Sequence, residues 1–135
     1  MKNDLFFEAS DGWLFASIMM SCMFYGKVKL GKIILTGDTI NHAIFSLSQI
    51  NDGLSRLESE GFVERRGTNI FVTKKTKQFA KAHKKHFELC IDEQVRYQRL
   101  FKTMPLTHKT IYREYFSKEE YKNILRKKYS DWFAV

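Results

Sequence analysis

The chain has little of the chemistry that marks secreted, membrane or catalytic proteins. It contains two cysteines among 135 residues, Cys22 and Cys90, and their separation matches neither a disulfide framework nor a metal motif. This scarcity favours a reduced, cytoplasmic protein. The main apolar run, from Trp13 to Tyr25, is shorter than a bilayer-spanning helix requires. Because acidic rather than basic residues precede that run, we expect no signal peptide and no membrane association.

Catalytic and cofactor motifs are also missing from the sequence. It has no glycine-rich phosphate loop, no Gly-x-Ser-x-Gly motif and no nucleophile placed beside a base. His83, His86 and Cys90 fall on one face of an expected helix, a spacing that suits a metal ion. No fourth ligand accompanies them, and neighbouring lysines oppose a cation, so a solvated basic face is the favoured interpretation. We therefore predict a non-enzymatic protein with no cofactor and no metal.

Apolar surface and positive charge are abundant instead. Apolar residues make up 44% of the chain and aromatic residues 15%, enough for a folded core. The 23 Lys and Arg outnumber the 15 Asp and Glu, which gives a formal net charge of +8. A basic balance is common among soluble proteins, but it also favours a polyanionic partner such as nucleic acid.

The stretch from Phe45 to Lys75 carries the clearest structural signals. Ser46 and Gln49 match a capping box at the start of a helix. Apolar residues then recur at spacings of three and four, which predicts a helix over 47–60 with one buried face. The residues of that face are Leu47, Ile50, Leu54 and Leu57. Gly61 is placed for a left-handed helix cap.

The pattern after this helix changes to a period of two. Residues 62–66 predict a strand, 67–69 a tight turn and 70–73 the return strand. Before this centre the patterns predict a loose or docking arm over 1–9, an apolar buried helix over 12–25 capped by Ser10 or Asp11, a short strand over 28–30 and a helix over 31–43. After it they predict a long amphipathic helix over 76–104 ended by Pro105, a short helix or turn over 107–116, and a last helix from the Ser117–Glu120 capping box. For 32–35 a strand remains the alternative.

The words LSRLESEGFVERR and IFVTKKTKQFAK resemble the recognition helix and wing of MarR/PadR-like winged-helix proteins. The matching residues are Leu54, Leu57, Glu60, Gly61, Phe62, Val63, Val72 and Thr73. The resemblance implies sequence-directed DNA binding, usually as a dimer, although many winged helices dock proteins instead. It also implies that the C-terminal extension dimerises or holds a ligand. We expect a homodimer through the C-terminal helices, with helix 12–25 as a further surface.

Recognition of double-stranded DNA by a winged helix requires polar side chains in the major groove and a basic wing on the phosphates. With the apolar face turned inward, the predicted DNA-binding residues of the third helix are Ser46, Ser48, Gln49, Asn51, Asp52, Ser55 and Arg56. Gln49 and Asn51 suit an adenine edge, and Arg56 suits guanine or phosphate. Positive charge around the wing comes from Arg65, Arg66, Lys74, Lys75 and Lys77.

The charge of the third helix argues against this prediction. Asp52, Glu58 and Glu60 outnumber Arg56, whereas a helix that faces phosphates is not normally acidic. Gly53, in the helix interior, is costly relative to alanine and suggests the close approach of another helix. A winged-helix module that docks a protein and does not bind DNA therefore remains the alternative.

Together these patterns predict an α+β, mostly helical fold. A winged helix-turn-helix domain with a two- to three-stranded wing is expected over 10–80, after the N-terminal arm over 1–9. Residues 81–135 are expected to form a helical C-terminal extension that dimerises. The predicted function is DNA binding by a small dimeric transcriptional regulator.

Overall fold

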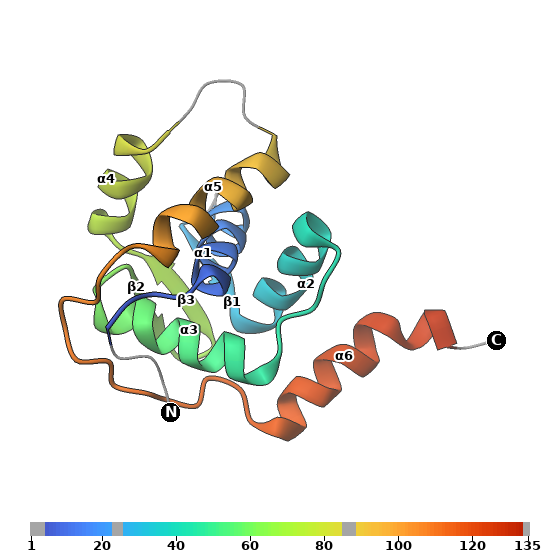
Figure 1. The fold of residues 1–135 in the computed structure, drawn as a ribbon. Coiled ribbons are helices and arrows are strands. Elements are labelled where there is room, and N and C mark those ends of the chain that lie inside the picture. Colours follow the sequence, from blue (N-terminus) through green and yellow to red (C-terminus); the bar gives the residue numbers. More distant parts are fainter. Residues whose placement is uncertain (1–4, 23–25, 85–88, 134–135) are drawn as a thin grey trace.

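The computed structural model describes residues 5–22, 26–84 and 89–133. Within these ranges the protein is α+β and about 60% helical, with six helices and a small three-stranded antiparallel sheet (Figure 1). In chain order the elements are α1 (Ala9–Ser21), β1 (Lys27–Lys29), α2 (Leu30–Asn41), α3 (Leu47–Ser59), β2 (Val63–Arg66), β3 (Asn69–Val72), α4 (Lys74–Ala82), α5 (Cys90–Lys102) and α6 (Lys118–Phe133).

Helix α1 is the centre of the fold. Its residues from Asp11 to Ile18 are all buried, and α5, α2 and α3 pack around it (Figure 1). The Phe15 ring lies 4.8 Å from the Tyr97 ring and 5.0 Å from the Phe101 ring, centroid to centroid. The predicted burial of this helix on several sides is confirmed, because its apolar residues leave no polar face for solvent.

The start of α1 differs from the prediction. The helix begins at Ala9 and Glu8 is its N-cap, so the expected cap at Ser10 or Asp11 is wrong. Asp11 lies in the first turn instead, where its carboxylate accepts a hydrogen bond of 2.8 Å from the Glu8 N–H. The expected end at residue 25 lies outside the described residues.

The sheet has the strand order β1-β3-β2, so β3 is its central strand. Val28, Ile70 and Val63 point from the three strands into the core and are almost fully buried. The predicted strands are confirmed, but the hairpin turn is shorter than expected. Asn69 pairs with Arg66 inside the ladder, which leaves Gly67 and Thr68 as the loop. Gly67 has a φ of +60°, a conformation that favours glycine.

Helix α3 forms as its sequence signals predict. The Ser46 hydroxyl accepts a hydrogen bond of 3.0 Å from the Gln49 N–H, and the Gln49 side chain accepts one of 2.9 Å from the Ser46 N–H. At the other end Gly61 has a φ of +81°. The N–H groups of Gly61 and Phe62 bond back to Glu58 and Leu57, which completes a Schellman cap.

Two predictions for the helices need correction, and one is confirmed. The single long helix over 76–104 is wrong, because two helices, α4 and α5, occupy this stretch. Helix α4 also begins two residues earlier, since the Thr73 hydroxyl caps it by accepting from the Thr76 N–H at 3.3 Å. The helix predicted over 31–43 is confirmed as α2, so the alternative strand over 32–35 is wrong.

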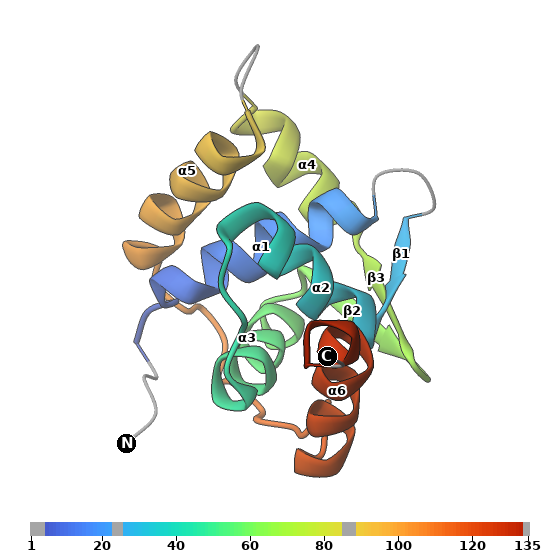
Figure 2. The same ribbon diagram turned by 90° about the vertical axis from the view of Figure 1, so that its right-hand side faces the viewer.

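The segment that follows α5 is the largest departure from the prediction. Residues 105–117, named the strap from here on, contain no helix, whereas a short helix or turn is predicted over 107–116. The strap runs along α3 in an extended path (Figure 1). It ends at the predicted Ser117–Glu120 capping box, which is confirmed by both of its hydrogen bonds. Helix α6 then packs on the core through Tyr121, Ile124 and Leu125. Its far end extends away from the body of the molecule (Figure 1), and the helix is seen nearly end-on in Figure 2.

A prediction follows from the close contact between α1 and α5. A Cβ atom at Gly12 would overlap the backbone of Tyr97 and Gln98, so Gly12→Ala is expected to lower the free energy of unfolding by about 1–3 kcal/mol. Chemical denaturation measures this. Gly31→Ala is the matched control, because its Cβ would lie 3.5 Å from Ile124, an ordinary contact. Equal stability of the two variants would contradict the proposed packing constraint.

Candidate nucleic-acid interface

The polar face of α3 is covered by the strap. Three α3 side chains, one helical turn apart, accept hydrogen bonds from the main chain of the strap. These bonds run from Ile111 N–H to Ser59 (2.9 Å), from Arg113 N–H to Ser55 (2.8 Å), and from Tyr115 and Phe116 N–H to Asn51 (3.0 and 2.9 Å). The Asn51 amide also donates to the Phe116 carbonyl at 3.0 Å.

The register of these bonds follows from the geometry of the two elements. Two residues of an extended chain advance about 6.6–6.8 Å, and four residues of an α-helix advance about 6.0 Å. Alternate N–H groups of the strap therefore meet every fourth side chain of the helix. Because the strap numbering rises as the α3 numbering falls, the two elements run antiparallel. The polar side chains of α3 serve as acceptors for an extended peptide.

Glu60, at the end of α3, holds the start of the strap. Its carboxylate accepts hydrogen bonds from the Thr107 N–H and hydroxyl, both at 2.8 Å, and from the His108 N–H at 2.7 Å. The His108 ring nitrogen Nδ1 lies 3.0 Å from the same carboxylate. Burial by itself raises the pKa of Glu60, but the hydrogen bonds from Thr107 and His108 outweigh it and hold the pKa below its ordinary value.

Arg56 does not project outward as predicted. Its side chain is 2% exposed, and its guanidinium forms a two-point ion pair with Asp11 of α1, at 2.7 and 3.0 Å. Burial would lower the pKa of Arg56, but the bonds and charge of Asp11 raise it above its ordinary value. The prediction that Arg56 faces guanine or phosphate is wrong in its geometry, because the buried carboxylate of Asp11 requires a cation inside the fold.

The other predicted residues of α3 are also occupied. Asn51 and Ser55 hold the strap, so the expected free projection of both side chains is wrong. Ser46 and Gln49 bond to each other's backbone as the helix cap, and the Ser48 hydroxyl bonds to the Asp52 carboxylate at 3.3 Å. Gly53 confirms the expected close approach, since a Cβ there would lie 2.7 Å from Leu14 and 2.8 Å from Asp11 of α1.

The two arginines of the hairpin point to opposite faces of the sheet. Arg65 lies on the inner side, with its guanidinium 5.3 Å from the Tyr115 ring of the strap. Arg66 lies on the outer side, 4.7 Å from the Phe71 ring, and bonds to Glu64 at 3.1 Å. Both remain exposed. The predicted wing charge is therefore present, but only Arg66 belongs to the outer face of the sheet.

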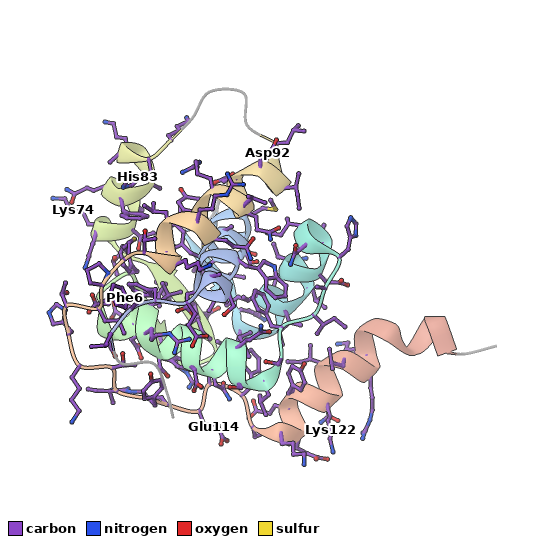
Figure 3. All side chains as sticks on the ribbon, viewed as in Figure 1. Phe6, Lys74, His83, Asp92, Glu114 and Lys122 are labelled. Carbon is purple, nitrogen blue, oxygen red and sulfur yellow. The ribbon has the colours of Figure 1, made fainter. Side chains whose placement is uncertain are left out.

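The lysines of α4 add to this charge. Lys74 is exposed at the start of the helix and extends away from the body of the molecule (Figure 3). Lys75 is also exposed, and its ammonium group donates to the Glu60 carbonyl at 2.5 Å. Lys77 is exposed one turn further along α4.

Positive charge is concentrated on the sheet and α4. Residues 27–32 and 62–84 contain ten Lys and Arg and one acid, Glu64, a formal net charge of +9. The rest of the chain, with 13 basic and 14 acidic residues, has a net charge of −1. All ten basic residues are exposed: Lys27, Lys29, Lys32, Arg65, Arg66, Lys74, Lys75, Lys77, Lys81 and Lys84. We call the surface formed by nine of these residues, all except the inward-facing Arg65, the basic face.

Sequence reasoning missed the part of this face that comes from β1. Lys27 and Lys29 flank the buried Val28 and both point outward. Their alternation around one apolar residue is the signal that would have placed them on the solvent side of a strand. Phe71, on the neighbouring strand, was also missed, although it alternates with the inward-facing Ile70 and Val72 in the same way.

The chain matches no protein-family model, no curated protein and no solved structure. None of the helices in the described part of the chain has the length and apolar character that crossing a membrane requires. The His83, His86 and Cys90 set lies partly outside the described residues. Burial raises the pKa of the Cys22 thiol to about 11, which makes that cysteine a poor nucleophile near neutral pH.

The buried ion pair gives a stability prediction. Arg56→Ala leaves the Asp11 carboxylate buried without its cation, so the free energy of unfolding is expected to fall by about 3–5 kcal/mol. Arg65→Ala is the control, because this arginine is exposed, and a change within about 0.5 kcal/mol is expected. Urea denaturation of both variants provides the comparison. A loss at Arg56 no larger than that at Arg65 would show that the pair does not hold α1 to α3.

Glu60 gives a prediction about pH. Its pKa is lower in the folded protein than in the unfolded chain, so its stabilising effect is complete above about pH 4.3, the ordinary pKa of glutamate. The effect disappears as the pH falls through the lowered pKa. Glu60→Gln should therefore lower the melting temperature at pH 7, and the gap to the unmodified protein should narrow below pH 4.

The control for this experiment is Glu114→Gln. Glu114 is an exposed strap residue (Figure 3). Its substitution should leave the melting temperature almost unchanged at pH 7 and at pH 3. A gap between the Glu60 variant and the unmodified protein that stays constant from pH 7 to pH 3 would rule out the carboxylate as its cause.

Proposed function

We propose that the protein is a non-enzymatic winged-helix protein that binds nucleic acid through its basic face. The order helix, strand, helix, helix, strand, strand from α1 to β3 supports the winged-helix assignment. The hairpin of β2 and β3 occupies the place of the wing, directly after the third helix.

The separation of charge is the observation that carries the proposal. A net charge of +9 lies on residues 27–32 and 62–84, the segments that contain the sheet and α4, while the remainder of the chain has a net charge of −1. Charge that serves only solubility does not need to be clustered on one part of a fold. Clustered positive charge increases the affinity for a polyanion, because each phosphate that pairs with Lys or Arg releases a condensed counterion.

The state of α3 decides how the nucleic acid is held. The side chains expected to contact base edges are Gln49, Asn51 and Arg56. They already bond to the Ser46 N–H, to the strap and to Asp11, respectively. Contacts to phosphates position a protein on nucleic acid but carry no sequence information. Binding through the basic face is therefore expected to depend strongly on salt and weakly on sequence.

A protein-docking function is the second candidate, and the strap supports it. The polar face of α3 already binds an extended peptide through main-chain N–H groups. A winged-helix module with this property is suited to holding an extended segment of another protein in the same way, in place of the strap. This candidate would be preferred if the basic face proved unable to bind nucleic acid.

The test is a salt series with labelled oligonucleotides of mixed sequence, single-stranded and duplex, followed by fluorescence anisotropy. The variant Lys27→Gln, Lys29→Gln, Lys77→Gln should bind less tightly, and the slope of log K against log salt should become shallower by about 2 to 3. The control Lys118→Gln, Lys122→Gln, Arg126→Gln removes the same charge from exposed positions on α6 and should behave as the unmodified protein. Equal losses in both variants would contradict the proposal.

A further inference from the structure

The outer face of the sheet presents an aromatic ring among cations. The pairing of the three strands places six side chains on this face: Lys27 and Lys29 from β1, Asn69 and Phe71 from β3, and Glu64 and Arg66 from β2. Phe71 belongs to the central strand, so both neighbouring strands flank it. It lies outside the buried core, to which Ile70 and Val72 of the same strand contribute.

Two cations lie over the ring of Phe71. The Lys27 ammonium lies 5.9 Å from the ring centroid, and the Arg66 guanidinium lies 4.7 Å from it. These two cations come from opposite sides, β1 and β2. Glu64 holds the Arg66 guanidinium through two bonds of 3.1 and 3.3 Å. Lys29 and Asn69 form the next row of the same face.

An exposed ring beside cations favours single-stranded over double-stranded nucleic acid. A single strand presents the flat faces of its bases together with its phosphates, and proteins bind it by stacking bases on aromatic rings beside positive charge. A duplex encloses its base faces in the stack, so an aromatic ring on a sheet gains nothing from them. Groove recognition of a duplex by α3 is blocked by the strap over Asn51 and Ser55.

We propose that the outer face of the sheet is a binding site for single-stranded nucleic acid, in which a base stacks on Phe71 beside the Arg66 guanidinium, and Lys27 and Lys29 bind the flanking phosphates. This inference rests on the proposed function and names its substrate class. Asn69 lies beside the ring in the same strand and offers an amide to a base edge or a sugar. The site tolerates any sequence, because every base has a face that can stack.

The experiment compares a labelled oligothymidylate with a duplex of the same length at one low salt concentration. The unmodified protein is expected to bind the single strand at least about tenfold more tightly than the duplex. Phe71→Ala should weaken single-strand binding by about tenfold or more, while duplex binding changes by less than about twofold. In a separate salt series, the slope of log K against log salt for the Phe71→Ala variant should equal that of the unmodified protein, because the charge is unchanged. Phe71→Tyr keeps the ring and should retain single-strand binding.

Phe6→Ala provides the matched control, because Phe6 is an exposed phenylalanine, 45% accessible, that lies on the N-terminal segment and not on the sheet. It should bind both ligands as the unmodified protein does. Melting temperatures of all three variants establish that they are folded. Duplex binding as tight as single-strand binding, with Phe71→Ala affecting neither, would overturn the inference and leave the proposed function intact. Failure to bind either ligand at low salt would overturn the proposed function and the inference together.

Discussion

The ion pair between Arg56 and Asp11 fixes the relation between α1 and α3, on which the rest of the structure depends. Asp11 is completely buried, and it accepts bonds from Arg56 and from the Glu8 N–H at the start of its own helix. Gly53 allows α3 to approach to this carboxylate without a side chain between them. A buried carboxylate without a cation is strongly destabilising, so the pair favours the arrangement of α1 and α3 that brings Arg56 to Asp11.

The apolar face and the polar face of α3 both make contacts within the fold. Ile50, Leu54 and Leu57 fill the core, Arg56 neutralises Asp11, and the polar side chains carry the strap. The acidic helix α3 and the basic segments that contain the sheet and α4 therefore have different roles. The helix holds the fold and its own C-terminal segment together, and the charge available to a polyanion lies on the other elements.

The features that sequence could predict are those decided by a few neighbouring residues. The capping boxes at Ser46 and Ser117, the glycine at 61 and the strands around 28, 63 and 70 all appear where local chemistry placed them. The features that sequence could not predict depend on groups far apart in the chain. Arg56 is buried because of Asp11, 45 residues away, and the strap lies on side chains 47 to 65 residues before it. The apolar stripe over 76–104 also continues across the break between α4 and α5, so periodicity alone did not reveal it.

The hydrogen bonds between α3 and the strap determine which substitutions the strap tolerates. The helix bonds mainly to N–H groups of the strap backbone, and every amino acid except proline supplies one. Side chains of the strap that face solvent are free to vary, whereas proline would remove a bond at 111, 113, 115 or 116. The single proline of the chain, Pro105, lies just ahead of these positions. The sequence of the strap is therefore constrained in two ways, by the exclusion of proline at these four positions and by the burial of the Tyr115 and Phe116 side chains in the core.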